Sequence, residues 1–130
     1  MNNIELIARA VILNRNKIIL CRIKGESWYF LPGGHVEFGE KIEASLKREL
    51  KEETGIKIKL NKIIGVMENF YKEKRKNHHE INVVFLGTAA NQKISSKEPY
   101  IEFEYVNKKY IKNKTILPKK IKPLLIKWLK

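Results

Sequence analysis

Three glutamates in the middle of the chain lie on one side of a predicted helix. The helix is expected to begin at Glu40 and to end at Gly55, because a glycine just past the last apolar residue of a helical repeat is a common stop. Glu49, Glu52 and Glu53 follow the spacing i, i+3 and i+4, which brings their side chains together. At about 100° per residue they border the apolar stripe of the helix, so a carboxylate cluster beside buried side chains is predicted. The stripe consists of Ile42, Leu46 and Leu50.

Clustered carboxylates next to apolar surface repel one another and resist the loss of water. A divalent cation would relieve both problems, and Mg²⁺ is typically bound by carboxylates together with substrate phosphates. The alternative is a solvated acidic helix with Glu–Lys pairs. Three glutamates alone do not decide between these interpretations.

The residues around the glutamates follow a longer pattern. Gly34 is followed after five residues by Glu40, and after seven more by Arg48-Glu49-Leu50-x-Glu52-Glu53-x-Gly55-Ile56. This pattern resembles the Nudix box at every defined position, and the preceding Leu31-Pro32-Gly33 is also similar to that family. The resemblance implies an α/β fold, a Nudix-type α/β/α sandwich with a mixed β-sheet, a box loop and helix, and a C-terminal helix.

The same resemblance implies an enzyme, a Nudix pyrophosphohydrolase that depends on Mg²⁺ or Mn²⁺. Members of this family cleave a nucleoside diphosphate linked to another moiety. Water attacks one phosphorus, and the metal neutralises charge on the attacking and leaving oxygens. The expected partner is therefore a small nucleotide-type substrate, namely a nucleotide, a nucleotide sugar or a dinucleotide.

The resemblance also assigns roles to residues of the box. Glu49, Glu52 and Glu53 are expected to hold the metal, and the carbonyl group of Gly33 is expected to be a further ligand. Glu49 and Glu52 are the expected catalytic carboxylates, with Glu49 preferred as the general base. Arg48 is expected to support them through its planar, bidentate guanidinium group.

Later residues supply candidates with weaker support. The family often places one more metal-binding carboxylate beyond the box, and Glu98 and Glu102 are the candidates here; each is also consistent with an ordinary surface glutamate. Trp28 and Tyr29 are candidates for stacking on a nucleobase, with core packing as the alternative. His79 is a candidate phosphate contact, but consecutive strand residues point to opposite faces, so His78 and His79 are not expected to share a metal ion.

Apolar runs and turn residues predict the remaining elements. Pro118 or Pro123 is expected in the first turn of the C-terminal helix, and Gly65 is expected to mark a bulge or bend. The predicted strands cover residues 4–13, 17–22, 28–31, 57–71, 81–86 and 100–106, and the C-terminal helix covers residues 117–129.

Composition limits the class of protein. At 130 residues the chain is expected to form one domain, 1–130. It has no uninterrupted apolar run of about 18 residues and no recognisable signal peptide, so no membrane partner is expected. Cys21 is the only cysteine, which fits a reducing cytoplasm.

The formal net charge of +13 allows two interpretations. It is either a field that attracts nucleotides or RNA, or the background of a chain rich in lysine. Nucleic acid is therefore a possible but not the favoured partner. Hydrolysis at RNA 5′ ends and a non-catalytic nucleic-acid-binding role stay open as alternative functions, and the sequence does not predict the oligomeric state.

Overall fold

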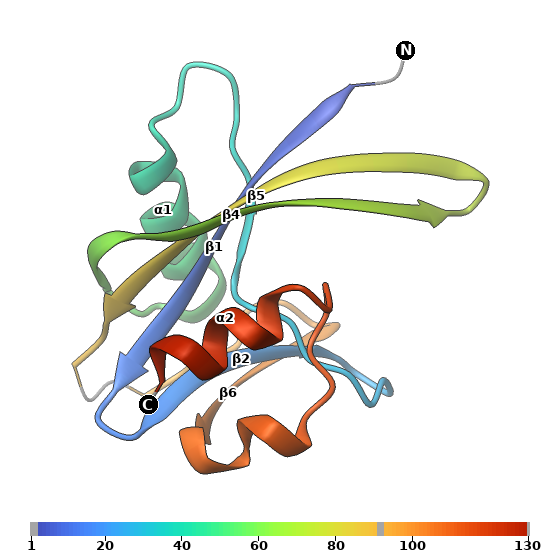
Figure 1. Cartoon of the computed structure of the whole chain (residues 1–130). Helices are drawn as coiled ribbons and strands as arrows, with labels where there is room; N and C mark the ends of the chain where they lie inside the picture. Colours follow the sequence, from blue (N-terminus) through green and yellow to red (C-terminus); the bar gives the residue numbers. More distant parts are fainter. Residues whose placement is uncertain (1–2, 91–92, 130) are drawn as a thin grey trace.

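The computed structural model describes residues 3–90 and 93–129. Its elements form a mixed sheet with two α-helices and one short 3₁₀ helix (Figure 1). In chain order they are β1 (Ile4–Asn14), β2 (Lys17–Ile23), β3 (Gly33–His35), α1 (Ile42–Thr54), β4 (Lys59–Glu73), β5 (Lys76–Thr88), β6 (Ile101–Asn107), η1 (Lys108–Asn113) and α2 (Ile121–Trp128).

Strand β1 lies near the middle of the sheet, whose order is β4-β5-β1-β2-β6. One edge of β1 pairs in parallel with β5. The other edge is shared between β2 and β3. β2 pairs with β1 only near their turn, at Leu13 and Asn14, whereas β3 pairs with residues 7–9 of β1. The sheet therefore splits between β1 and β2. The segment from Phe30 to Pro32 fills the split, since Pro32 accepts a hydrogen bond from Ala10 N (3.1 Å) and Phe30 N donates to Cys21 O (2.9 Å).

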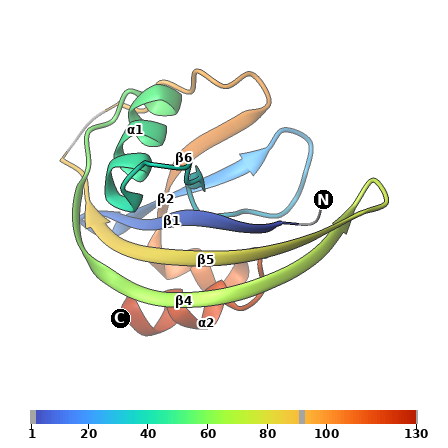
Figure 2. The same ribbon diagram turned by 90° about the horizontal axis from the view of Figure 1, so that it is seen from above.

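The two α-helices cover opposite faces of the sheet (Figure 2). Leu46 and Leu50 of α1 belong to one core cluster, with Val83 and Phe85 of β5. The second cluster contains residues of α2 together with Val84 of β5. Alternate residues of β5 therefore serve the two cores, as the period of a strand requires. The predicted α/β/α sandwich with a mixed sheet is confirmed. The clusters receive Leu46 and Leu50 from α1, and Ile121 and Leu125 from α2.

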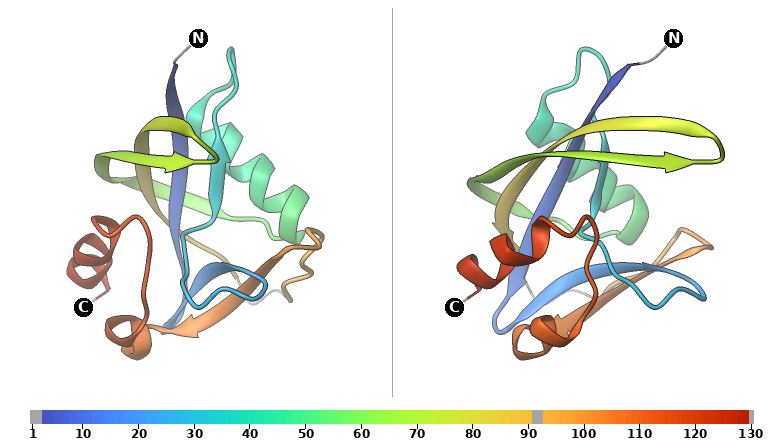
Figure 3. Two further views of the ribbon diagram at one scale, coloured as in Figure 1. Left: turned by 90° about the vertical axis from the view of Figure 1, so that its right-hand side faces the viewer. Right: turned by 45° about the vertical axis from the view of Figure 1, so that its right-hand side comes forward.

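Strands β4 and β5 form a long hairpin that extends beyond the rest of the sheet (Figure 3). Its pairing shifts register between Leu60 and Lys62 and again between Ile63 and Gly65, so the predicted irregularity at Gly65 is confirmed. A Cβ at Gly65 would lie 2.8 Å from Leu124 Cδ2, so this glycine allows α2 to pack closely on the sheet.

The structure corrects three of the predicted element boundaries. Residues 28–31 form only isolated bridges, and the paired strand is Gly33–His35, because the backbone of Gly33 packs directly on β1. Helix α1 begins at Ile42 rather than at Glu40, since Lys41 is still extended. Helix α2 begins at Ile121 rather than at 117, which puts Pro123 in its first turn and Pro118 before it. The 3₁₀ helix η1 was not predicted.

Candidate active site

Arg48 contacts three carboxylates of the candidate site. Its Nε and Nη2 donate to the two oxygens of Glu40 at 2.7 and 3.1 Å, so the guanidinium fork binds Glu40 in a bidentate manner. Its Nη1 lies 3.3 Å from Glu52 Oε2 and 3.4 Å from Glu49 Oε1. The hydrogen bond from Arg48 is the main reason that the pKa of Glu40 falls to about 2. One guanidinium group therefore positions three carboxylates on or beside α1.

Glu49 and Glu53 are both partly buried. The side chain of Glu49 is 21% exposed. Burial of the Glu53 carboxyl group, the hydrogen bond with Glu49 and the negative charges of Glu49, Glu98 and Glu52 raise the pKa of Glu53 to about 8. Partly dehydrated carboxylates that repel one another attract a proton or a cation.

Gly34 brings its backbone against this cluster, and the preceding Gly33 packs on β1. A Cβ at Gly34 would lie 3.1 Å from the Cδ atom of Glu49, so a larger residue would press on that carboxylate. Gly33 has a φ of +143°, and a Cβ there would overlap the carbonyl oxygen of Ala8. Only glycine satisfies both the conformation and the contact at Gly33. Its carbonyl group as a metal ligand stays a prediction.

The two candidate metal ligands beyond the box, Glu98 and Glu102, differ in their distance from the glutamate cluster. Glu98 follows a segment that is tied to the end of α1, where Lys97 N donates to Glu53 O at 2.8 Å, and its charge contributes to the raised pKa of Glu53. Glu102 instead lies on β6 in an ion pair with Arg22 at 3.2 Å. The structure therefore brings Glu98 to the cluster, whereas Glu102 is held elsewhere.

The donor chemistry of the cluster fits a divalent cation, since it consists of carboxylate oxygens. In residues 3–90 and 93–129, no three or more carboxylate, imidazole or thiol side chains are already arranged to hold a metal ion. The side chain of Glu52 is 62% exposed and lies 3.3 Å from Arg48 Nη1. The glutamates would have to turn toward one another around an ion.

A cleft of about 820 Å³ opens between the last part of β4 (residues 68–73), the loop after β2 and the segment before α2. Trp28 and Phe30 line it from the loop, with their ring centroids 5.9 Å apart, and Tyr71 lines it from β4. Tyr29 does not line the cleft, because it is only 7% exposed and packs in the core cluster under α2. The structure therefore places Trp28 where a base could stack and uses Tyr29 for core packing.

One residue of the cleft, Arg9, was not singled out in the sequence. Arg9 donates to Leu31 O (3.0 Å) and to Asn82 Oδ1 (3.4 Å), and it lines the cleft together with Glu80. Burial lowers the pKa of Arg9, while the charges of Glu80 and Glu53 oppose that shift. Arg9 is therefore within electrostatic range of both the cleft and the glutamate cluster. The sequence feature that could have identified Arg9 is its position as a charged residue inside a mostly apolar strand.

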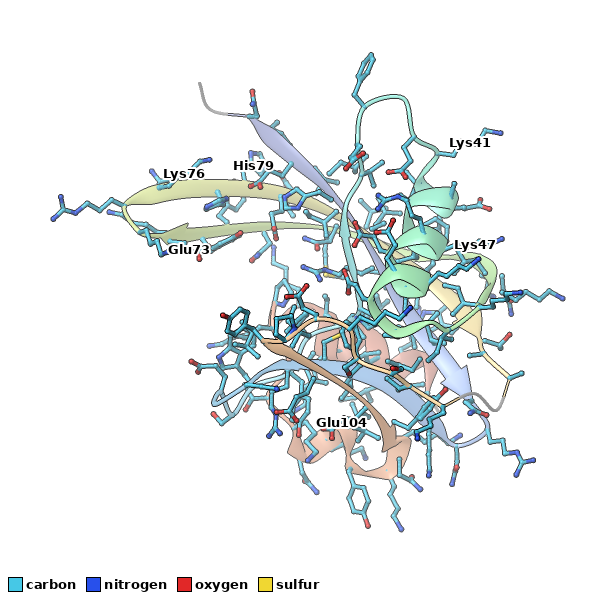
Figure 4. The ribbon with its side chains drawn as sticks, turned by 180° about the vertical axis from the view of Figure 1, so that it is seen from behind. Lys41, Lys47, Glu73, Lys76, His79 and Glu104 are labelled. Carbon is cyan, nitrogen blue, oxygen red and sulfur yellow. The ribbon has the colours of Figure 1, made fainter. Side chains whose placement is uncertain are left out.

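His79 lies on the β4–β5 hairpin (Figure 4) and is not among the residues that line the cleft. Its ring stacks on Phe70 with centroids 4.3 Å apart, and its Nε2 lies 2.8 Å from Glu68 Oε2. His78 contacts Glu5 instead, at 2.8 Å. The two histidines thus face opposite sides of the strand, as predicted, and a phosphate contact for His79 stays a prediction.

The fold matches solved structures over nearly the whole chain. A MutT Nudix hydrolase from Burkholderia pseudomallei superposes with a TM-score of 0.78 at 21% identity, covering 98% of this chain and 99% of that one. A MutT protein from Bacillus halodurans gives the same TM-score and identity, covering 97% and 82%. The architecture is therefore that of the Nudix hydrolases.

Sequence comparison defines the family. The Nudix domain model matches residues 5–125, and the chain belongs to the Nudix family. An 8-oxo-dGTP diphosphatase of Buchnera aphidicola is 34% identical over 96 residues, covering 70% of this chain and 68% of that protein. The nucleoside triphosphatase NudI of Escherichia fergusonii is 31% identical over 108 residues, covering 74% and 77%. An ADP-ribose pyrophosphatase of Methanocaldococcus jannaschii is 38% identical over 79 residues, and the aligned part spans only 46% of that protein.

None of the helices in the described part of the chain has the length and apolar character needed to cross a membrane. The cytoplasmic location stays a prediction.

Proposed function

We propose that this chain is a divalent-metal-dependent hydrolase of the diphosphate linkage in a nucleoside diphosphate derivative. The observation that carries the proposal is the pair of partly buried carboxylates, Glu49 and Glu53, of which Glu49 lies against Arg48 and Gly34. Arg9 links this cluster to a cleft with aromatic walls, which suits a substrate with phosphates at one end and a base at the other. Family membership and relatives named as diphosphatases support the same reaction class.

In this proposal Glu49, Glu52, Glu53 and Glu98 would hold Mg²⁺ or Mn²⁺, with the carbonyl group of Gly33. The ion would supply positive charge to the diphosphate oxygens. Glu49 accepts a proton from the attacking water, whose oxygen forms a bond to phosphorus while the anhydride P–O bond breaks and the second phosphate leaves. Arg48 keeps Glu49 and Glu52 in place without itself touching the substrate.

A substrate panel with Mg²⁺ tests the proposal. The panel contains nucleoside triphosphates, ADP-ribose, a UDP-sugar and 8-oxo-dGTP, and released phosphate or pyrophosphate is measured. At least one member is expected to be hydrolysed, with loss of activity when EDTA removes the metal. A protein that binds Mg²⁺ by calorimetry but hydrolyses no member would contradict the proposal.

Metal binding is tested separately, on the intact chain without substrate. Mg²⁺ or Mn²⁺ is expected to raise the melting temperature by mass action, and Glu53→Gln is expected to weaken that rise. Glu43→Gln is the matched control, because Glu43 is exposed in the first turn of the same helix. Equal shifts in the wild type and both variants would contradict the assignment of Glu53.

The two nucleic-acid alternatives have no separate support in the site. Labelled lysines lie on different elements, with Lys41 at the start of α1, Lys47 on its outer side and Lys76 on the hairpin (Figure 4). A partner with a long phosphate backbone is usually met by cations that form a continuous stripe.

A further inference from the structure

We propose that Glu80 is a specificity-determining residue that selects a nucleotide whose base presents two adjacent N–H donors, as guanine does. The inference deepens the proposed function and rests on it, because it assigns the base end of the same substrate. Glu80 is on β5, close to the point where the β4–β5 hairpin leaves the rest of the sheet.

Glu80 is a charged residue in an unusual place. It lines the cleft and is 5% exposed, which makes it one of the few buried polar residues of the described chain. Asn69 Nδ2, from the paired residue of β4, donates to its Oε1 at 3.2 Å. None of the ion pairs between described residues includes Glu80. Arg9, which lines the same cleft, faces Glu80 with a positive charge. The two carboxylate oxygens can together accept about four hydrogen bonds, so they can accept N–H donors of a ligand in addition to the one from Asn69.

The chemistry of a carboxylate favours one kind of base. Its two oxygens are acceptors side by side, and the Watson–Crick edge of guanine presents N1–H and the N2 amino group side by side as donors. Adenine and cytosine present one amino group next to a ring nitrogen that is itself an acceptor, which would face the second carboxylate oxygen. Uracil has one N–H between two carbonyl groups. Guanine is therefore the common base that satisfies both oxygens.

The surroundings of Glu80 fit a base rather than a free phosphate. Aromatic rings line the cleft from two elements, with Trp28 and Phe30 on the loop after β2 and Tyr71 on β4, and a base could stack against these rings. A phosphate beside Glu80 would meet repulsion from its negative charge, whereas an N–H donor would not. Arg9 is within range of Glu80 and of Glu53, so the phosphates of the same substrate have a cation on the side toward the glutamate cluster.

The test compares GTP, ITP and ATP, which share the sugar and the phosphates. Hypoxanthine in ITP lacks only the N2 amino group of guanine. Wild-type kcat/KM is expected to be about tenfold or more higher for GTP than for ITP, because one hydrogen bond to a buried carboxylate is lost. Equal values for GTP and ITP in the wild type would overturn the inference, and this comparison needs no variant that has to fold.

Glu80→Gln gives the second comparison. An amide offers one acceptor and one donor, which matches the N6 amino group and N1 of adenine, so the preference is expected to move from GTP toward ATP. Glu43→Gln makes the same chemical change on an exposed position of α1 and is expected to keep the wild-type preference. A folded Glu80→Gln protein that still prefers GTP over ATP as strongly as the wild type would overturn the inference.

The outcomes separate this inference from the proposed function. Hydrolysis of several nucleotides with no discrimination among bases would leave the proposed function standing and remove the role of Glu80. If none of the three triphosphates is hydrolysed, calorimetric binding of GMP and IMP decides. Tighter binding of GMP supports the role of Glu80, and equal or undetectable binding overturns it, whereas the substrate panel alone decides the hydrolase activity.

Discussion

The glutamate cluster and the cleft are built in different ways. The cluster comes from residues 40–53 of one loop and helix, and Arg48 holds three of its carboxylates through contacts of 2.7 to 3.4 Å. The cleft takes its lining from β1, the loop after β2, the β4–β5 hairpin and the segment before α2. A local motif thus supplies the groups expected to act on phosphates, whereas distant segments supply the groups expected to recognise the rest of the substrate. Changes in the cluster should lower kcat, and changes in the cleft should mainly raise KM.

The largest effect is expected in the cluster. Glu52→Gln keeps the size of the side chain but removes a negative charge, and activity is expected to fall by about 100- to 1,000-fold, as for loss of one preorganised charge. Lys51→Gln is the control on the neighbouring exposed residue and is expected to remain active. Steady-state kinetics on the best substrate measure the loss of activity, and melting curves show whether both variants are folded. Near wild-type hydrolysis by Glu52→Gln would show that the cluster does not carry the reaction.

A smaller loss is expected when the support of the cluster is changed. Arg48→Lys keeps the charge but loses the fork that binds Glu40, and activity is expected to fall by about 10- to 100-fold, as for other residues that orient metal ligands. Glu40→Gln removes the other half of the same contact. The double variant should therefore lose little more than the stronger single variant. Fully additive losses would mean that Arg48 and Glu40 act separately.

The cleft provides the contrasting prediction. Trp28→Ala removes an aromatic wall, and KM is expected to rise by about tenfold with little change in kcat, since stacking on a base is worth about 1–3 kcal/mol. Trp28→Phe keeps a ring and is expected to recover most of the affinity. Steady-state kinetics separate the two constants, and a fall in kcat alone would remove the distinction between the two regions.

The smallest effect is expected outside both regions. Hydrogen bonds with His35 and His78 lower the pKa of Glu5 below its usual value. A lowered pKa means that the unfolded chain takes up the proton first, so this stabilisation is present above the ordinary pKa of about 4.5 and is lost as the pH falls below it. Glu5→Gln is expected to lower the melting temperature by about 2–4 °C at pH 7 and by less at pH 4. Melting curves at both pH values test this, and an equal decrease at pH 4 would contradict it.

The spacing of residues 34–56 determined much of what lies along one helix. The periodicity of the helix brings Glu49 and Glu53 together beside Leu46 and Leu50, and Gly55 ends the helix with a φ of +76°. These contacts join residues a few positions apart, so a known helical period is enough to predict them. The bidentate contact between Arg48 and Glu40 did not follow from this period, because Glu40 lies before the first residue of α1.

Only the tertiary structure decided the roles of residues that meet across the sheet. In the sequence, Trp28 and Tyr29 are equivalent neighbours, but in the structure Trp28 lines the cleft and Tyr29 is buried under α2. Arg9 and Glu80 are more than 70 residues apart and meet because β1 pairs in parallel with β5. Register and strand order depend on the packing of the whole chain rather than on any local period, so no short segment could specify these contacts.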